Sequence, residues 1–470
     1  MAASISKKSD LTQGPLLSKI ILFSLPLMAT GVLSLLFNTA DTIVVGRWGG
    51  ATVEARESAL AAVGSCGSLI SLITSVFIGL SAGTGVCMAH AIGARKEDEA
   101  QKVVHTAVLT GLIAGVIVAI IGQLFAPTLL RMMNTPESVL KQAVPYVRAF
   151  FCGIPANMLY NYCAAILRSS GDTTRPFIFL SVAGVVNVLL NLIMVLAFHT
   201  GALGVGIATA ASHWISCILI VRHLTKQTGY CHLDFKKIGM DRPTLKKILT
   251  IGLPAGFQSS LFGISNIIVQ SSINSFGDVV IAGNTAASNL DGYIYICQNS
   301  LYHTAMTFVG QNVGAQKPDR IKKSIFYCAC VAAVTGLLMG NLIRLGGPIL
   351  LQLYAPGNTE VIAAGIVRLS IMASTYFLCG LVDVGNGTLR AFGKSIVPML
   401  ITLAGSCLIR IVWIYTVFRI YTEQRVIYFS YPISWVITSS ALFIFVAIVY
   451  RDFKKQNPEI EKNSCSVEAE

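Results

Sequence analysis

The chain has 470 residues, of which 54% are hydrophobic and only 12% are charged. Soluble proteins average about a quarter charged residues, so this composition excludes an ordinary soluble domain and indicates a multi-pass membrane protein. The formal net charge of +13 could suggest a nucleic-acid partner, but the basic residues are spread over many short loops. We therefore expect a lipid bilayer, and no nucleic acid, as the partner of this surface.

Apolar stretches long enough to cross a bilayer recur along the chain, and we count twelve of them. Residues 1–15 are polar and lack an apolar core, so no cleavable signal peptide is expected there. The sequence thus predicts an all-α integral membrane protein with twelve transmembrane helices. Their predicted ranges are 17–46, 59–90, 101–126, 139–167, 175–198, 202–222, 247–275, 280–311, 322–347, 360–389, 396–419 and 426–450.

The distribution of positive charge predicts how the chain enters the membrane. Of the 35 Lys and Arg residues, 25 fall on alternate segments that include both ends of the chain. Membrane proteins keep such basic segments on the cytoplasmic side. We therefore expect a multi-pass protein of the plasma (inner) membrane with both termini in the cytoplasm.

The two halves of the chain look like copies of each other. Three pairs of segments match in the same order at nearly constant spacing, between 221 and 228 residues. They are K-I-I-L-F-S-L-P-L with K-I-L-T-I-G-L-P-A (19–27 and 247–255), G-A-R-K with G-A-Q-K (93–96 and 314–317), and L-R-S-S-G-D-T-T-R-P with L-R-A-F-G-K-S-I-V-P (167–176 and 389–398). Six helices per copy is an even number, so the copies would be parallel, related by a pseudo-two-fold axis along the membrane normal.

The repeat and a change in composition predict the domain boundaries. Residues 223–246 are polar and basic, and they form the longest connection in the middle of the chain. We expect an N-terminal six-helix lobe at 1–222, a cytoplasmic linker at 223–246, a C-terminal six-helix lobe at 247–450 and a disordered cytoplasmic tail at 451–470. In such repeats the substrate path runs between the halves near the membrane midplane.

One carboxylate stands out inside the first span. Asp41 lies in an apolar helix, where an ionisable group costs at least ~2.5 kcal/mol and usually marks an ion or substrate path. Asn38 lies one turn earlier, and Asn187 and Asn191 form an i, i+4 pair in the fifth span. Thr209 adds a hydroxyl in the sixth span. These groups predict a pocket for H⁺ or Na⁺, although an acid buried for packing alone is the alternative.

A second group of polar side chains suggests substrate binding. Aromatic and amide side chains facing a cavity suit amphipathic organic cations. Polar residues on apolar helices also hold helices together, so a packing role remains open. The candidate substrate-binding residues are Asn157, Asn161, Gln258, Asn266, Asp291, Tyr293 and Gln298.

The remaining charges in or near the spans have structural explanations, and the sequence lacks common enzyme motifs. Arg410 in the eleventh span could pair with Asp383 in the tenth, which would make both residues structural. Arg390 stands at an inner helix end, where ordinary capping explains it. No Walker A, HExxH or Ser-centred motif is present, so we expect no enzyme, no cofactor and no ATP hydrolysis.

The chain resembles the multidrug and toxic compound extrusion (MATE) transporters. The resemblance rests on P-L-M with N-T-A-D-T-I-V-V-G-R-W-G within 26–49, on the doubled L-R-x-x-G…P at 167–176 and 389–398, and on the G-A-R-K and G-A-Q-K loops. It implies two six-helix lobes and the export of amphipathic, often cationic, drugs or toxins in exchange for H⁺ or Na⁺. The alternative within the same superfamily is a flippase for a lipid-linked precursor. We expect a monomer.

The resemblance also assigns roles to single positions. The family's first-helix acid falls on Asp41 and its fifth-helix asparagine on Asn187, which implies an ion site at these two residues, with Na⁺ as one candidate. The family often has an acid one turn later, where this chain has Asn191. Another branch of the family has an acid in the tenth helix, which falls on Asp383 and makes this residue a further candidate for ion coupling. That branch also has a glutamate in the seventh helix, which is absent from 258–266.

Overall fold

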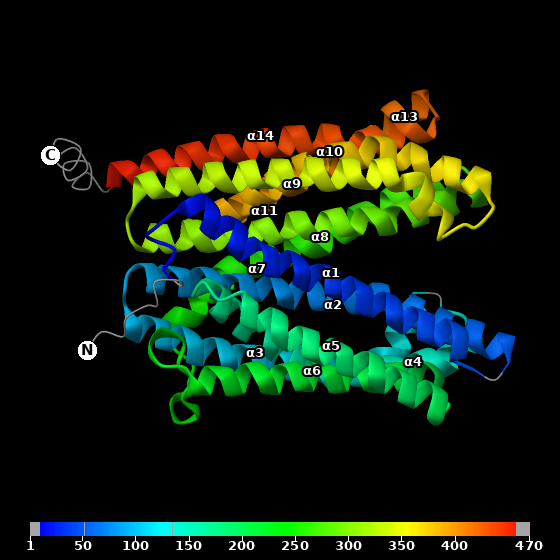
Figure 1. The fold of residues 1–470 in the computed structure, drawn as a ribbon, viewed down its shortest axis with the longest axis horizontal. Helices are drawn as coiled ribbons and strands as arrows, with labels where there is room; N and C mark the ends of the chain where they lie inside the picture. Colours follow the sequence, from blue (N-terminus) through cyan, green and yellow to red (C-terminus); the bar gives the residue numbers. More distant parts are fainter. Residues whose placement is uncertain (1–9, 51, 134, 457–470) are drawn as a thin grey trace. The chain divides into compact units, whose positions relative to one another are not determined.

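A computed structural model describes residues 10–50, 52–133 and 135–456, and within these ranges all regular secondary structure is helical (Figure 1). This confirms the predicted all-α membrane class. The helices are α1 (Leu16–Trp48), α2 (Val53–Gly93), α3 (Glu97–Met132), α4 (Glu137–Ser169), α5 (Thr174–Leu192), α6 (Gly201–Lys226), α7 (Arg242–Asn274), α8 (Asp278–Gly314), α9 (Pro318–Gln352), α10 (Thr359–Ala391), α11 (Ile396–Thr402), α12 (Ile409–Tyr415), α13 (Val417–Ile420) and α14 (Gln424–Gln456).

Each of the twelve predicted spans falls on a helix or on a helix with its continuation. Among the described residues, eleven segments are long and apolar enough to cross a membrane by length and composition. The remaining predicted span is α8, a helix of 37 residues that carries many amides and an acid and is therefore less apolar. Its length of about 55 Å, at 1.5 Å per residue, still exceeds the thickness of a bilayer core.

Two spans contain a π-helical turn. The fifth span passes from α5 into η1 (Ile193–Ala197), and the eleventh passes from α11 through η4 (Leu403–Leu408) into α12. A π turn takes more residues than an α turn, so it changes which face of the helix the following side chains occupy. Simple helical periodicity cannot place the residues beyond such a turn.

The chain packs as two compact units. Unit 1 contains Ala29–Met88 and Lys96–Gly256, and unit 2 contains Asp10–Met28, Ala89–Arg95 and the chain from Phe257 onward. The first part of α1 thus packs in unit 2 and the remainder in unit 1, whereas α7 begins in unit 1 and continues in unit 2. The domain boundaries that follow the sequence repeat stay a prediction.

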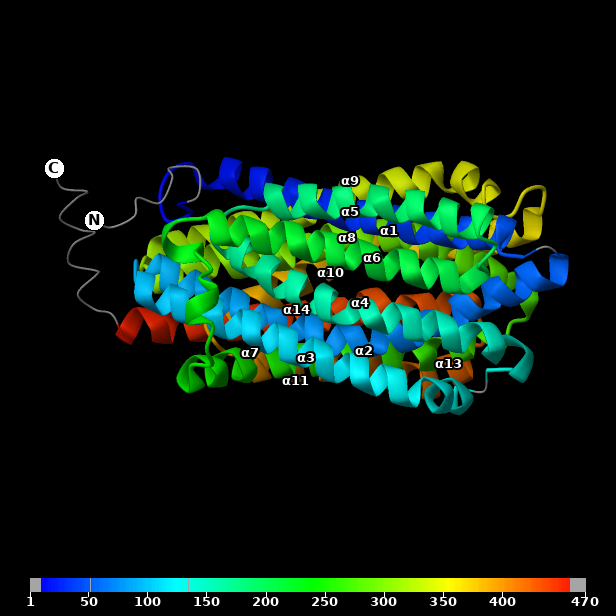
Figure 2. The same cartoon turned by 90° about the horizontal axis from the view of Figure 1, so that it is seen from below.

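In unit 1, α4 packs against both α3 and α6, and α5 packs against α6 (Figure 2). Its apolar core is formed by large buried side chains of α4, among them Phe151, Ile154 and Met158. The predicted linker also belongs to this unit. It contains two short 3₁₀ turns, η2 (Gly229–Cys231) and η3 (Phe235–Lys237), and its Leu233 is 1% exposed.

In unit 2, α10 packs against α8, α9 and α14 (Figure 1). Buried residues of α10 and α14, such as Met372 and Trp435, belong to its main apolar core. α14 continues to Gln456, so the first residues of the tail predicted to be disordered, 451–456, are helical. The rest of that tail lies outside the described residues.

The segment before α1 is held on unit 2 by hydrogen bonds from basic side chains to its backbone carbonyls. Arg320 at the start of α9 donates to the carbonyls of Leu11 (3.1 Å), Gln13 (2.8 Å) and Gly14 (3.0 Å). Lys317 donates to the Thr12 carbonyl at 2.9 Å. Leu11 itself is 2% exposed and packs in an apolar cluster with the first turns of α1. These contacts fix the entry of the first span.

Glycines allow helices to pack closely within each unit, as in other membrane bundles. A Cβ added to Gly340 of α9 would lie 1.9 Å from the backbone oxygen of Ala373 on α10. On the same helix, a Cβ at Gly346 would meet only the Leu350 side chain, at 3.5 Å. Gly340 therefore sets the distance between α9 and α10, and Gly346 does not.

Gly340→Ala should destabilise the protein, because the backbone of α10 cannot move away cheaply. Overpacking of this kind typically costs about 1–3 kcal/mol. We expect a lower apparent melting temperature of the purified protein in detergent. Gly346→Ala is the matched control and should leave the melting temperature unchanged or slightly raised. Equal melting temperatures for both variants would contradict the close contact.

Candidate functional site

Asp41 of α1 lies at one end of a hydrogen-bonded chain of side chains in unit 1. The Asn191 amide of α5 donates to the Asp41 carboxylate, and its nitrogen also lies 3.3 Å from the Asn187 amide oxygen. The Asn187 amide in turn donates to the Thr209 hydroxyl of α6 at 3.4 Å. Four of the six residues predicted for ion coupling are therefore brought together by α1, α5 and α6.

The sequence explains why α1 can approach α5 here. Gly184 lies one turn before Asn187 on α5, and a Cβ at this position would be 1.7 Å from the Phe37 ring of α1. The glycine thus leaves room for Phe37, which is one turn before Asp41. Asn187 and Asn191 share a helix face because they are four residues apart. A larger side chain at position 184 would have to displace the Phe37 ring.

Among the described residues, the Asp41 carboxylate has no counterion. Asn187 is 4% exposed and Asn191 is fully buried, whereas Asp41 is half-buried. None of the ion pairs between described residues includes Asp41. The Asn191 amide oxygen also has no partner in the described part of the chain. The site therefore offers uncompensated oxygen atoms, which suit a proton or a small cation.

Asn38 does not join this chain. Its side chain is exposed and makes no hydrogen bond within the described residues, although it lies one turn from Asp41. The backbone carbonyl of Asn38, by contrast, accepts a hydrogen bond from the Thr42 hydroxyl at 2.9 Å. The role predicted for Asn38 in ion coupling stays a prediction.

Asn157 and Asn161 of α4 form a separate polar contact in unit 1. Asn161 donates to the Asn157 amide oxygen at 3.0 Å and to its backbone carbonyl at 2.8 Å. The Asn157 amide nitrogen lies 3.3 Å from the His213 ring of α6. The i, i+4 pair thus joins α4 to α6, and both asparagines remain partly accessible.

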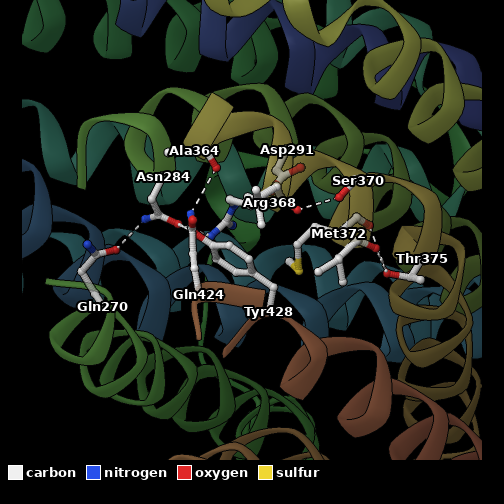
Figure 3. Close-up of polar contacts among 12 residues, drawn as sticks. Gln270, Asn284, Asp291, Ala364, Arg368, Ser370, Met372, Thr375, Gln424 and Tyr428 are labelled. Atoms are coloured by element: carbon white, nitrogen blue, oxygen red, sulfur yellow. Dashed lines mark hydrogen bonds and ion pairs between the residues drawn. The ribbon is translucent and has the colours of Figure 1, made fainter. Parts of the chain in front are cut away.

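In unit 2, Asp291 forms a buried ion pair that is the centre of a polar cluster (Figure 3). The guanidinium of Arg368 on α10 donates to the Asp291 carboxylate of α8 at 2.8 Å, and side-chain exposure is 7% for Arg368 and 2% for Asp291. Arg368 also donates to the Asn284 amide oxygen at 2.8 Å. The other carboxylate oxygen of Asp291 has no partner among the described residues.

The cluster extends onto α7 and α14. Tyr428 donates to the Asn284 amide oxygen at 3.1 Å, and Asn284 donates to Gln270 at 3.1 Å (Figure 3). Gln424 donates to the Tyr428 hydroxyl at 3.1 Å. The guanidinium of Arg368 lies 5.6 Å from the Tyr428 ring, within cation–π range. We call Asp291, Arg368, Asn284, Tyr428, Gln270 and Gln424 the unit 2 polar cluster.

Gln258 and Asp383 lie in a different part of unit 2. Arg390, near the end of α10, donates to the Gln258 amide oxygen at 2.6 Å and to the Tyr302 hydroxyl at 2.7 Å. Arg390 is 6% exposed, so its buried side chain joins α10 to α7 and α8, beyond the capping role expected from its position. One carboxylate oxygen of Asp383 is buried and has no partner in the described part of the chain.

The remaining predicted substrate residues do not form one group in unit 2. Gln298 is fully buried and donates to the Ala332 carbonyl of α9 at 3.2 Å. Asn266 is exposed and makes no side-chain hydrogen bond within the described residues, and Tyr293 packs against the apolar core of the unit. A groove between α10 and α14 holds none of these residues, since its described lining is Ser370, Ile371, Ser374, Thr375, Phe429, Pro432, Ile433, Val436 and Ile437.

Two features of the site differ from the sequence analysis. The ion pair suggested between Arg410 and Asp383 is wrong, since no pair between them occurs among the described residues, and the only charged residue that Asp291 pairs with is Arg368. Sequence reasoning also missed Arg368. The signal was available, because Arg368 is an arginine inside an apolar span and such a cation needs a buried partner.

Comparison with known proteins places the chain in a family. The family model described as MatE matches residues 26–193 and 254–416, which together make up more than half of the chain. The two matches begin at Pro26 and Pro254, the prolines that the sequence repeat pairs. The chain belongs to the MATE family. It is therefore a transporter and not an enzyme.

Individual relatives agree with this assignment. The chain is 28% identical over 390 residues to "Probable multidrug resistance protein YoeA" of Bacillus subtilis (strain 168), covering 81% of this chain and 82% of the relative. It is 24% identical over 330 residues to "FAD transporter" of Shewanella oneidensis (strain ATCC 700550 / JCM 31522 / CIP 106686 / LMG 19005 / NCIMB 14063 / MR-1), covering 68% and 70%.

A solved structure confirms the fold of this MATE protein. The chain matches, with a TM-score of 0.88 and 22% identity, a structure described as "Reverse polarity of binding pocket suggests different function of a MOP superfamily transporter from Pyrococcus furiosus Vc1 (DSM3638)". The match covers 96% of this chain and 100% of the other. The predicted architecture of twelve helices in two six-helix lobes is therefore confirmed as the fold of the family.

Proposed function

We propose that this MATE transporter is a secondary active antiporter that exports amphipathic, often cationic, compounds in exchange for H⁺ or Na⁺ by alternating access. The observation that carries the proposal is the Asp41 carboxylate. It lies in a membrane helix, accepts a hydrogen bond from Asn191 and has no cationic partner among the described residues. A carboxylate of this kind is expensive in a membrane and is usually functional.

The chemistry of the pocket explains how an ion could drive transport. Surroundings poor in water disfavour the charged form of an acid, so uptake of a proton or Na⁺ stabilises the occupied pocket. The carboxylate, the amide oxygens of Asn187 and Asn191 and the Thr209 hydroxyl are all oxygen ligands, which Na⁺ accepts and which can also hold a proton. Where the cycle is electrogenic, each positive charge that enters contributes ~2.3 kcal/mol per 100 mV.

The first helix can transmit the change of charge. Pro26 lies within α1 and removes one backbone hydrogen bond, which makes this point of the helix easier to bend. The part of α1 that contains Pro26 packs in unit 2, and the part that contains Asp41 packs in unit 1. Ion binding at Asp41 therefore acts on a helix that belongs to both units. We propose that this coupling shifts the transporter between two packings.

The relatives' names support export of small molecules. One is named a probable multidrug resistance protein and another a FAD transporter, so cargo among relatives includes an anionic dinucleotide as well as drugs. A flippase for a lipid-linked precursor is the alternative. The few charges in the apolar spans favour small amphipathic cargo. We further propose a monomer in the plasma membrane with both termini in the cytoplasm, as the basic loops predict.

Transport in reconstituted vesicles tests the proposal. The purified protein would be placed in proteoliposomes with ethidium as the cationic dye, and a pH gradient and a Na⁺ gradient would be imposed separately. We expect dye movement against its own gradient with at least one of the two ions, and none in protein-free vesicles. Dye movement that proceeds only down its own gradient, whichever ion gradient is imposed, would contradict coupling.

A further inference from the structure

Arg410 on α12 is a buried cation that forms no ion pair with any of the described residues. It is 2% exposed, and its Nε donates to the Ser434 hydroxyl of α14 at 3.0 Å. Its guanidinium lies 4.1 Å from the Tyr431 ring centroid and 5.8 Å from those of Trp435 and Phe262. We call Arg410 with Ser434 and these three rings the Arg410 cage. Its residues all belong to unit 2.

The hydrogen-bonding capacity of Arg410 is mostly unused. A guanidinium has five N–H donors, and the described residues provide an acceptor only for Nε. No carboxylate lies within 4.0 Å of it, because Asp291 is paired with Arg368 and Asp383 forms no ion pair in the described part of the chain. Aromatic rings stabilise a cation but accept no ordinary hydrogen bonds. A buried guanidinium with unused donors and no counterion is costly, unless a ligand provides the missing acceptors and negative charge.

The sequence repeat identifies what the Arg410 cage corresponds to in unit 1. Ser212 of α6 and Ser434 of α14 stand 222 residues apart, and each donates to the carbonyl three residues earlier, at 2.8 Å to Thr209 and 2.7 Å to Tyr431. Tyr431 and Thr209 are themselves 222 residues apart, so they correspond at the spacing found between 167–176 and 389–398. In unit 1 Thr209 contacts Asn187, one of the proposed ion ligands.

The π turns place Arg410 at the position of Asn187. Up to Pro398 the repeat spacing is 222, but η4 precedes Arg410 whereas η1 follows Asn187. A π turn adds one residue, so beyond η4 the spacing becomes 223 and Arg410 corresponds to Asn187. The counterpart of Asp41, at the spacing of 228 found for the first helix of each half, is the apolar Val269. Unit 2 therefore has a cation at the position of Asn187 and an apolar side chain at the position of Asp41.

We propose that the Arg410 cage is an anion subsite of the transporter, which binds the carboxylate or phosphate group of an amphipathic cargo molecule. A guanidinium recognises such planar or tetrahedral anions through two parallel N–H donors. The three rings provide apolar surface for the flat part of the same molecule. This inference rests on the proposed export function and extends its substrate class to acidic and zwitterionic amphiphiles.

Exposed residues of α7 follow Phe262 in the sequence. The next residue, Gly263, is exposed, and a Cβ there would meet no atom within 4 Å. Asn266 lies one turn further on the same face of α7 and is also exposed. An exposed polar position, Asn266, thus lies one turn from the half-buried ring of the cage.

The test compares two dyes that differ only in an acid group. Rhodamine 110 carries a free carboxylate, and rhodamine 123 is its methyl ester. Binding to the full-length protein in nanodiscs would be measured by fluorescence polarisation without any ion gradient, so the result does not depend on coupled transport. We expect the parent protein to bind the acid more tightly. Arg410→Gln should weaken binding of the acid about tenfold and leave the ester within twofold.

Variants separate recognition from a structural role. Arg419→Gln removes one exposed charge from the neighbouring α13 and should change neither dye's affinity. Arg410→Lys keeps the charge but loses the forked donors, so it should fall between the parent and Arg410→Gln. Arg410→Met should melt no lower than the parent, because it removes an unpaired buried charge. A large loss of stability in Arg410→Met would instead indicate a structural cation.

Lipid is the other source of such an anion, and the nanodisc composition distinguishes it. The two dyes would be compared in phosphatidylcholine alone and in mixtures with phosphatidylglycerol. If a lipid phosphate competes for the subsite, phosphatidylglycerol will weaken binding of the acid in the parent and not in Arg410→Gln. Equal affinity of the parent for acid and ester, with no effect of phosphatidylglycerol, would overturn the proposal. An equal loss of affinity for both dyes in Arg410→Gln would also overturn the proposal.

Discussion

Asp41→Asn should abolish gradient-driven export and reduce it to the level of protein-free vesicles. Asparagine keeps the shape of the side chain and can still contact Asn191, but it can neither take up a proton nor provide a full negative charge for Na⁺. Because the described residues contain no second acid near this pocket, nothing can replace the lost carboxylate. The measurement is dye transport in proteoliposomes under a pH gradient and, separately, a Na⁺ gradient.

Folding and insertion should survive this change. The carboxylate of Asp41 has no ion-pair partner among the described residues, so its neutralisation leaves no other charge unpaired. The melting temperature of Asp41→Asn should therefore equal or exceed that of the parent. Glu137→Gln is the matched control, since its side chain is 77% exposed and its contact with Arg131 lies at the surface. It should transport normally.

The partners of Asp41 offer a graded version of the same experiment. Asn187→Ala and Asn191→Ala keep the acid but remove amide oxygens from the pocket, so they should weaken ion binding and leave some transport. The ion concentration for half-maximal transport should rise in both variants, while the maximal rate changes less. If Asp41→Asn pumps at the parental rate under both gradients, Asp41 is structural and the ion enters elsewhere.

The sequence predicts the helices well because apolar length is a local property. Every predicted span coincides with a helix or with a helix and its continuation, to within six residues at each end, including α8, whose polar residues reduce its apolar character. The chain Asp41–Asn191–Asn187–Thr209 could also be anticipated. Its members are rare polar groups in apolar helices, and the two asparagines share a face by their spacing.

Tertiary partners are harder to predict, for reasons that particular residues illustrate. Asn38 lies one turn from Asp41 but stays exposed, whereas Phe37, the residue before it, contacts α5 at Gly184. Arg410 forms no ion pair with Asp383 among the described residues, and it follows the π turn η4, which changes the helix face that later side chains occupy. Arg368 pairs with Asp291 across 77 residues. Neither a turn type nor a long-range pairing is visible in local periodicity.

The ion pair Asp291–Arg368 should be the most sensitive structural contact of unit 2. Arg368→Met would leave the Asp291 carboxylate, with 2% side-chain exposure, buried without a cation. Removing one partner of a buried ion pair lowers the free energy of unfolding by about 3–5 kcal/mol, and we expect a loss of this size here. We expect a large drop in apparent melting temperature in detergent and poor recovery of folded protein.

The double variant Asp291→Leu with Arg368→Met should recover most of this loss, because neither charge then remains buried alone. Asn284 keeps its hydrogen bond from Tyr428 in all of these variants, so the rest of the unit 2 polar cluster stays satisfied. Arg344→Met, at an exposed position of α9, controls for the loss of one arginine. A double variant that is no more stable than Arg368→Met alone would show that the arginine acts through its contacts with Asn284 and Tyr428 and not through the charge of Asp291.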